Sequence, residues 1–277
     1  MSNAIVKSII HPTDFSPAST DAFVHAMRIA LAARSELHLL HIDPPDRPSS
    51  FDNFPHVRTL LSAWGLMHEN DPRADVSRRF GVDITKCDIA DPEPVEAVVD
   101  YIEDHPGQLV VLGTEGRTGW EYLRKGSVAE RIARKARKAS LFVSAGARGF
   151  IDQSNGNLFL NRILLPIDHD TPWVDALNFV SRFSHMLNPE GVEIHLLHVG
   201  DQAPVVTASL NASGVVSVIQ RDGPVVPTIL EAADEFSVDM IAMPTAGHHG
   251  ILDALRGSVT ERVLHLARVP LLAVPAK

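Results

Sequence analysis

The sequence of 277 residues contains one cysteine, Cys87, and no apolar run long enough to span a bilayer. One cysteine excludes an internal disulfide and a cluster of thiolate metal ligands. The opening stretch MSNAIVKSIIHPTDFS becomes polar too early for a secretory signal, so we expect a cytoplasmic protein with no membrane partner. Positive charge is also scarce. With 25 Lys and Arg against 34 Asp and Glu, the net charge of −9 argues against a nucleic-acid partner.

Common catalytic and nucleotide-binding motifs are missing as well. The sequence has no G-x-S-x-G elbow, no H-E-x-x-H pair and no evident base for an attacking water, so we expect no catalytic residues. The glycine-rich segment at 113–127 is not a Walker A loop, because Lys125 precedes the last glycine instead of following it. Neither half opens its first helix with G-x-G-x-x-G, which disfavours a Rossmann dinucleotide site.

What the sequence does contain is an internal repeat. Four blocks recur in the same order: IIHPTDFSPAS with ILLPIDHDTPW, ELHLLHI with EIHLLHV, DPEPVEAVVDYIE with DGPVVPTILEAAD, and GSVAERIARKA with GSVTERVLHLA. Two copies of one unit predict two domains, at 1–147 and 161–277. The segment between them, 148–160, is rich in Gly, Asn, Ser and Gln and is interpreted as a linker.

The two copies differ in length at one place. The first copy carries about 26 extra residues after Ile42. Their apolar side chains recur at helical spacing, which predicts one amphipathic helix with Pro55 in its first turn. The apolar positions of that helix are Val57, Leu60, Leu61, Trp64 and Met67. We expect the second copy to lack this helix.

Strands and helices alternate along each copy. In the first copy we expect strands near 5–12, 37–42, 82–88, 109–113 and 141–144. Apolar runs such as LVVL and MIAM are continuous, as in strands that are covered on both faces. This pattern predicts an α/β fold with a doubly wound, five-stranded parallel sheet in each copy. Such sheets bind ligands at the carboxyl ends of their strands, where Asp14 and Gly113 both lie.

Two distant motifs give the sequence a family resemblance. The spacing G-x2-G-x9-G-S at 113–127, followed by VAERI, occurs together with PTDFS at the end of the first strand. With the order of elements and the duplication, these motifs resemble the universal stress protein family in its tandem, two-domain form. The resemblance implies two flavodoxin-like (adenine nucleotide alpha hydrolase-like) units related by a pseudo-twofold axis. It also implies that the last strands, LFVSA and LLAVP, pair as an internal dimer; a homodimer of the whole chain is an open alternative.

The resemblance implies ATP as the ligand, with Mg²⁺ as a candidate companion. The residue types suit an adenine nucleotide. A carboxylate can accept hydrogen bonds from ribose hydroxyls, and glycines let backbone amides approach phosphate closely. For Gly126 and Ser127 alone, a capped helix after a flexible turn is an equally good interpretation. Carried over position by position, the resemblance assigns the nucleotide site of the first half to Pro12, Thr13, Asp14, Ile42, Leu112, Gly113, Gly116, Arg117, Gly126, Ser127 and Val128.

The second half departs from this pattern. Pro244 stands where the first half has Gly113, and proline fixes φ and has no amide proton. We therefore expect the nucleotide mainly in the first half. The weaker second site would consist of Asp168, Val199, Gly247, Gly257 and Ser258.

The histidines raise the question of a metal. His38 and His41, and likewise His195 and His198, are three apart, which places the members of each pair on opposite faces of a strand. We interpret these four as hydrogen-bonded structural residues. A second group lies near the second crevice, but adjacent histidines rarely both bind one ion, so we expect no metal site there. That group consists of His169, Asp170, His248 and His249.

Together these features predict a stress-response regulator or sensor that binds ATP, with protein partners that the sequence does not identify. Three alternatives stay open. The first is a slow ATPase at the same site, and the second is a scaffold that binds no nucleotide. The third is a sensor for a metal or another ligand, centred on the second half.

Overall fold

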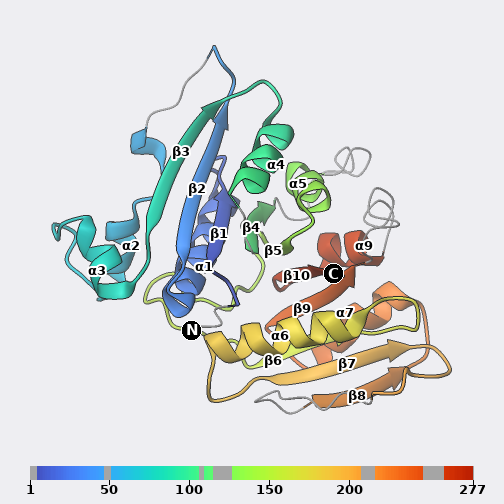
Figure 1. Cartoon of the computed structure of the whole chain (residues 1–277). Helices are drawn as coiled ribbons and strands as arrows, with labels where there is room; N and C mark the ends of the chain where they lie inside the picture. Colours follow the sequence, from blue (N-terminus) through green and yellow to red (C-terminus); the bar gives the residue numbers. More distant parts are fainter. Residues whose placement is uncertain are drawn as a thin grey trace.

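The computed structural model describes residues 5–46, 51–105, 109–114, 127–206, 216–245 and 259–276. Within these ranges ten strands form one sheet, in the order β3-β2-β1-β4-β5-β10-β9-β6-β7-β8 (Figure 1). Each half contributes five strands in the order 3-2-1-4-5, and helices cover both faces of the sheet. The predicted fold, two doubly wound parallel units in tandem, is confirmed.

The first half contains the five strands that the sequence predicts, with ends shifted by at most a few residues. Its elements are β1 (Ser8–Pro12), α1 (Pro17–Ala33), β2 (Glu36–Asp43), the short 3-10 helix η1 (Phe51–Asn53), α2 (Val57–Ala63), α3 (Ala74–Phe80), β3 (Ile84–Ala90), α4 (Pro94–Asp104), β4 (Leu109–Thr114), α5 (Val128–Ala136) and β5 (Ala139–Ser144).

The second half repeats this order. Its elements are β6 (Arg162–Pro166), α6 (Trp173–Leu187), β7 (Glu193–Val199), β8 (Val216–Arg221), α7 (Val225–Glu235), β9 (Met240–Thr245), α9 (Val259–Leu266) and β10 (Leu271–Pro275). Among the described helices, none combines the length and apolarity needed to cross a membrane.

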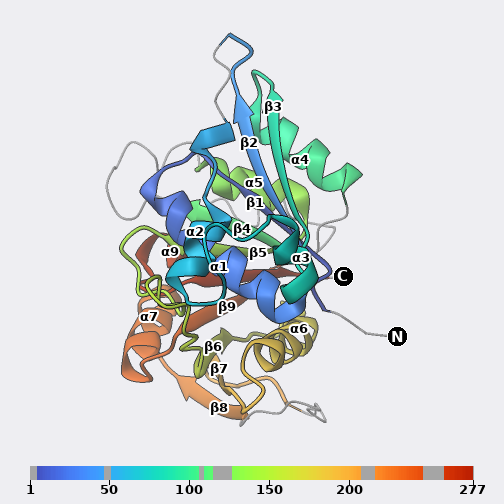
Figure 2. The ribbon, with the colours of Figure 1, turned by 90° about the vertical axis from the view of Figure 1, so that its left-hand side faces the viewer.

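The two halves join through their last strands. β5 and β10 pair in antiparallel orientation, with Leu141 opposite Leu272, which confirms the predicted pairing of LFVSA with LLAVP. Two apolar cores lie on the two faces of the sheet, and both extend across the join. One core packs under α1 and α6, which lie close together in Figure 2. The other packs under α4, α5, α7 and α9. The halves therefore share one continuous core on each face.

The segment at 148–160 is packed against the first half. Phe150 and Leu160 are fully buried, and an isolated bridge joins Ile151 to Leu158. The indole Nε1 of Trp64 donates to the carbonyl oxygen of residue 153 at 3.0 Å. The segment is therefore held partly by the insertion of the first half, and Arg148 at its start also bonds to Val238 O of the second half. Its role as the boundary between two domains stays a prediction.

The insertion contains a helix at the predicted place, α2, but this helix is shorter than the apolar spacing predicts, and a second short helix, α3, follows it. α2 ends at Ala63, and Gly65 follows in the left-handed region at φ +70°. A glycine adopts this conformation without strain and ends a helix there. Pro55 lies one residue before the N-cap, His56, and not in the first turn. Even so, most of the predicted apolar positions are buried: Val57, Leu61, Trp64 and Met67.

Candidate functional site

The sheet opens between β1 and β4 at the carboxyl ends of these strands. They pair only at Ile9 with Leu109 and at Ile10 with Val110. β1 continues alongside β2 as far as Pro12, and β4 continues alongside β5 as far as Thr114. This separation is the topological switch point of the first half, the place where doubly wound sheets bind ligands.

His11 bridges the floor of this opening. It is fully buried, and its Nδ1 lies 2.9 Å from the carbonyl oxygen of Val111 on β4. Its Nε2 is 3.4 Å from Ser19 Oγ, which donates in turn to Thr13 Oγ1 at 2.7 Å. Burial lowers the pKa of His11 to about 4, so the ring is neutral at pH 7. His11 therefore serves as a structural connection between β1 and β4.

The segment after β1 forms one side of the crevice. The amide of Thr13 donates a hydrogen bond to Leu40 O at 2.8 Å, and the carbonyl oxygen of Thr13 accepts one from His41 Nδ1 at 2.6 Å. These two bonds attach Thr13 to β2. Asp14 is exposed, and its Oδ1 accepts the amide of Ser16 at 3.0 Å. A carboxylate can accept further hydrogen bonds beyond this one. Asp14 is therefore held in place while it remains accessible to a ligand.

A cluster of aromatic rings from Phe15, His41 and Phe54 packs beside this segment. Phe15, with φ +62°, stacks on His41 at 4.0 Å between ring centroids, and its edge meets the fully buried Phe54 of the insertion. Nε2 of His41 bonds to Asp43 Oδ1 at 2.8 Å. Ile42, the residue expected to meet adenine, lies between these two side chains in sequence and is partly buried. The extra residues of the first copy therefore pack on the face of β2 that carries His41, and Ile42 faces the other apolar core.

β4 forms the opposite side. Leu112 is buried and Gly113 is partly exposed. A Cβ atom at Gly113 would come within 2.7 Å of Ala18 O and 2.8 Å of Ser19 N. Such a contact is too short, so the first turn of α1 requires glycine here whether or not a nucleotide approaches. The sequence analysis did not find this packing reason.

The helix after the glycine segment begins as its sequence predicts. Ser127 is the N-cap of α5, and its Oγ accepts the amide of Glu130 at 3.2 Å. Its hydroxyl also donates to Glu130 Oε1 at 3.1 Å. Burial raises the pKa of the Glu130 carboxyl, while His265 and this hydroxyl oppose the rise. Val128, the next site residue, is half exposed in the first turn. The remaining predicted residues of this segment, Gly116, Arg117 and Gly126, lie outside the described residues.

The corresponding crevice of the second half has different chemistry. Asp168 Oδ1 accepts the amides of Asp170 and Thr171 at 3.0 and 2.6 Å, and also the Thr171 hydroxyl. Val199 is partly buried, as Ile42 is. Pro244 lies in β9 beyond the length over which β6 and β9 pair. The Asp168 carboxylate is therefore more fully engaged by its own loop than that of Asp14. Three other residues of the weaker site, Gly247, Gly257 and Ser258, lie outside the described residues.

The strand histidines are structural, as predicted. His38 Nδ1 is 2.8 Å from the hydroxyl of Tyr101, and His195 Nδ1 is 2.8 Å from Ser217 Oγ. His198 Nδ1 is 3.0 Å from Ile167 O, which repeats the contact of His41 with Thr13 O. Of the group considered for a metal, His169 bonds through Nε2 to the carbonyl oxygen of residue 202 at 2.9 Å. His248 and His249 lie outside the described residues.

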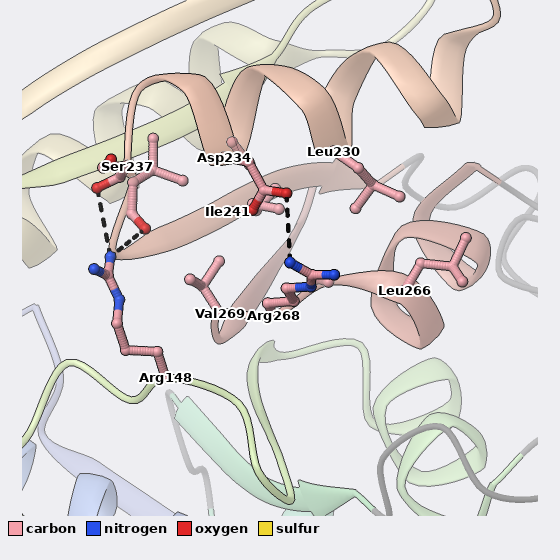
Figure 3. Close-up of a pocket in the computed structure, with 11 residues that line it drawn as sticks. Arg148, Leu230, Asp234, Ser237, Ile241, Leu266, Arg268 and Val269 are labelled. Carbon is pink, nitrogen blue, oxygen red and sulfur yellow. Dashed lines mark hydrogen bonds and ion pairs between the residues drawn. The ribbon is translucent and has the colours of Figure 1, made fainter.

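A separate cavity of about 390 Å³ lies at the amino-terminal ends of β9 and β10 in the second half (Figure 3). Two arginines reach its rim from different segments. Arg148 donates to Val238 O at 2.8 Å and to Asp239 Oδ1 at 3.0 Å, while Arg268 lies 4.0 Å from Asp234 Oδ2. Because both guanidinium groups already face protein acceptors, the cavity offers an anion little free charge. It lies at the opposite end of these strands from the second crevice.

Comparisons with known proteins agree with the fold and the duplication. The model of the universal stress protein family matches residues 6–144 and 206–275. Universal stress protein MJ0531 of Methanocaldococcus jannaschii is 29% identical over 137 residues, which cover 48% of this chain and 78% of that protein. Universal stress protein Sll1654 of Synechocystis is 30% identical over 142 residues, 44% of this chain and 90% of that protein. Each relative therefore matches about half of the chain.

Solved structures match the whole chain. A universal stress protein of Archaeoglobus fulgidus superposes with a TM-score of 0.64 and 17% identity, covering 99% of both chains. A second structure, from Pseudomonas aeruginosa, has a TM-score of 0.61 and 14% identity, with 99% of this chain and 95% of that chain covered. These likenesses show a shared fold over both halves. With the family model matching more than half of its residues, the chain belongs to the universal stress protein family.

Proposed function

We propose that this protein binds ATP in the crevice of its first half and acts as a regulator or sensor in the stress response. The observation that carries the proposal is the opening between β1 and β4, with the exposed carboxylate of Asp14 beside it. Ile42 adjoins the same side, and Gly113 lies on the other. The amino terminus of α5, which follows β4, supplies a positive dipole end suited to phosphate.

The comparison of the two crevices supports the first half as the nucleotide site. Asp14 has one local partner at Oδ1, whereas Asp168 Oδ1 receives three hydrogen bonds from its own loop. A ribose hydroxyl would therefore compete with fewer internal bonds at Asp14. Pro244 also removes the amide that Gly113 offers in the first half.

A regulatory role suits the described crevice better than fast catalysis. A general base must lie within hydrogen-bonding reach of the attacking water. Among the described residues, the two histidines nearest the crevice are already bonded, His11 to Val111 O and His41 to Thr13 O and Asp43. We therefore propose binding without rapid hydrolysis.

The test compares Asp14→Asn with its matched control, Asp168→Asn. Calorimetric titration of the full chain with ATP should give one site, which Asp14→Asn weakens by about tenfold to a hundredfold, because a hydrogen bond to a charged group contributes about 1.5–3 kcal/mol. Asp168→Asn should leave the affinity nearly unchanged. No ATP-dependent rise in melting temperature, with no nucleotide released on denaturation, would contradict the proposal. Equal losses in the two variants would refute its placement in the first half.

A further inference from the structure

The last helices of the two halves, α5 and α9, bring three potential metal ligands together. In the repeated blocks GSVAERIARKA and GSVTERVLHLA, Glu130 and Glu261 occupy equivalent positions. His265 occupies the position that Arg134 has in the first half. The pseudo-twofold arrangement thus places one glutamate from each half beside a single imidazole from the second half. The two helices lie near the join of the halves in Figure 1.

The geometry of this cluster is compact. One ligand atom from each of Glu130, Glu261 and His265 can be chosen so that all three lie within 4.8 Å of one another. His265 Nε2 lies 3.4 Å from Glu130 Oε1. The Glu130 side chain is 8% exposed. His265 Nε2 has no contact with solvent and no hydrogen-bond partner among the described residues. A buried imidazole nitrogen without a hydrogen-bond partner therefore faces a buried carboxylate.

We propose that Glu130, Glu261 and His265 bind a divalent transition metal ion of the Zn²⁺ class between the two halves. Zn²⁺ binds imidazole nitrogen and carboxylate oxygen at about 2.0–2.2 Å, which places neighbouring ligand atoms roughly 3.3–3.5 Å apart in a tetrahedral site. The distance from Glu130 to His265 already has this value. The other two distances between ligand atoms are at most 4.8 Å, so side-chain rotation must shorten each by no more than about 1.5 Å.

The ligand set also selects among ions. An imidazole favours Zn²⁺, Cu²⁺, Fe²⁺ or Ni²⁺, whereas Mg²⁺ and Ca²⁺ prefer oxygen ligands alone. Three protein ligands leave a fourth position for water, as in open zinc sites. Because the ligands come from α5 and α9, the ion would connect the two halves on the face of the sheet that these helices cover. It would add to the strand pairing of β5 with β10.

The simplest competing interpretation is an ion pair of protonated His265 with Glu130. In that case the cluster holds a proton and has no specific affinity for a metal. The two interpretations differ in metal stoichiometry and in the spectrum of bound Co²⁺, neither of which depends on nucleotide binding. The test is therefore independent of the proposed function.

The experiment uses the full chain, stripped with a chelator and titrated with Zn²⁺ by calorimetry. We expect one Zn²⁺ per chain, and Co²⁺ in its place should give visible d–d absorption. Glu130→Gln and His265→Arg should each weaken binding at least tenfold, since even loss of a residue that only supports a ligand costs 10–100-fold. His265→Arg introduces the residue found at the equivalent position of the first half. His185→Asn, on the exposed surface of α6, should bind as the unaltered chain does.

Several results would overturn the proposal. One is that the stripped chain takes up no stoichiometric Zn²⁺. Another is that Glu130→Gln binds as tightly as the unaltered chain, or that His169→Asn abolishes binding, which would move the ion to the second crevice. If Glu130→Gln fails to fold because its carboxylate is buried, Glu261→Gln replaces it: this side chain is only partly buried, and the same tenfold loss is expected.

Discussion

The two halves have one topology but differ in how polar groups are used at the carboxyl edge. The first half has a buried histidine, His11, across its opening, whereas the second has Leu165 at that position. In the first half Asp43 partners the ring of His41, whereas the second half has Gly200 there, in the positive-φ region. The duplicated framework was therefore preserved by its apolar positions, while the polar residues at the edge diverged.

The largest expected difference between the halves is in their response to acid. Burial lowers the pKa of His11 and of His25 in α1 to about 4, and the second half has Leu165 and Phe179 at these positions. In the unfolded chain these two rings bind protons below about pH 6.5, whereas in the folded chain they stay neutral down to about pH 4. The free energy of unfolding is therefore unaffected by these rings above pH 6.5 and decreases as the pH falls towards 4. Each histidine should lower the free energy of unfolding by about 3 kcal/mol at pH 4.

Urea unfolding at pH 7, 5.5 and 4 measures this effect. His11→Gln and His25→Gln should each reduce the pH dependence of the unfolding free energy between pH 6.5 and 4. His185→Gln, at an exposed position in α6, should leave it unchanged. An unaltered pH dependence in both buried variants would show that these rings do not account for the difference between the halves.

The next largest effect concerns the glycine that the second half replaces. Gly113→Ala should destabilise the protein by about 1–3 kcal/mol, because its Cβ would meet the backbone at Ala18 and Ser19. In the second half α6 begins at Trp173, two positions later than α1 does in the aligned repeat, and the strand accepts Pro244. Pro244→Ala should therefore cost less than Gly113→Ala. Denaturant midpoints of the two variants measure the difference, and equal losses would remove this explanation.

A smaller effect is expected at the pair of His41 and Asp43. Asp43→Asn keeps the shape but removes the charge that faces His41 Nε2, at a cost of about 1 kcal/mol. Thermal unfolding at pH 7 tests this change. The control is Asp201→Asn, an exposed site just beyond the corresponding strand of the second half, where no loss is expected. A larger loss at Asp201 would mean that charge near the edge, and not this pair, stabilises the fold.

Much of the fold could be predicted from the sequence because it rests on periodicity and repetition. Continuous apolar runs predicted the strands, and two copies predicted two units. The prediction for the insertion was less accurate, because its apolar spacing continues past the point where α2 ends, just before Gly65. Periodicity records which side chains are buried, and it does not report a change of backbone direction between them.

The candidate site was predictable only where its residues act locally. Ser127 caps α5 through an amide three residues away, which a short stretch of sequence is enough to indicate. The packing of Gly113 against Ala18 was not predictable, because it depends on how closely α1 approaches β4. The assignment of these residues to a nucleotide stays a prediction that the crevice geometry supports.

By itself, the sequence determined the duplication, the order of strands and the places where each chain segment turns at the carboxyl edge. The physical reason is that these features depend on interactions between near neighbours and on repeated burial patterns. The pairing of β5 with β10 was expected only from the family resemblance, and only the tertiary structure decided that Glu130 converges with Glu261 and His265. Glu130 lies far from the other two residues in the chain, and their meeting depends on the relative orientation of two folded units, which no local pattern records.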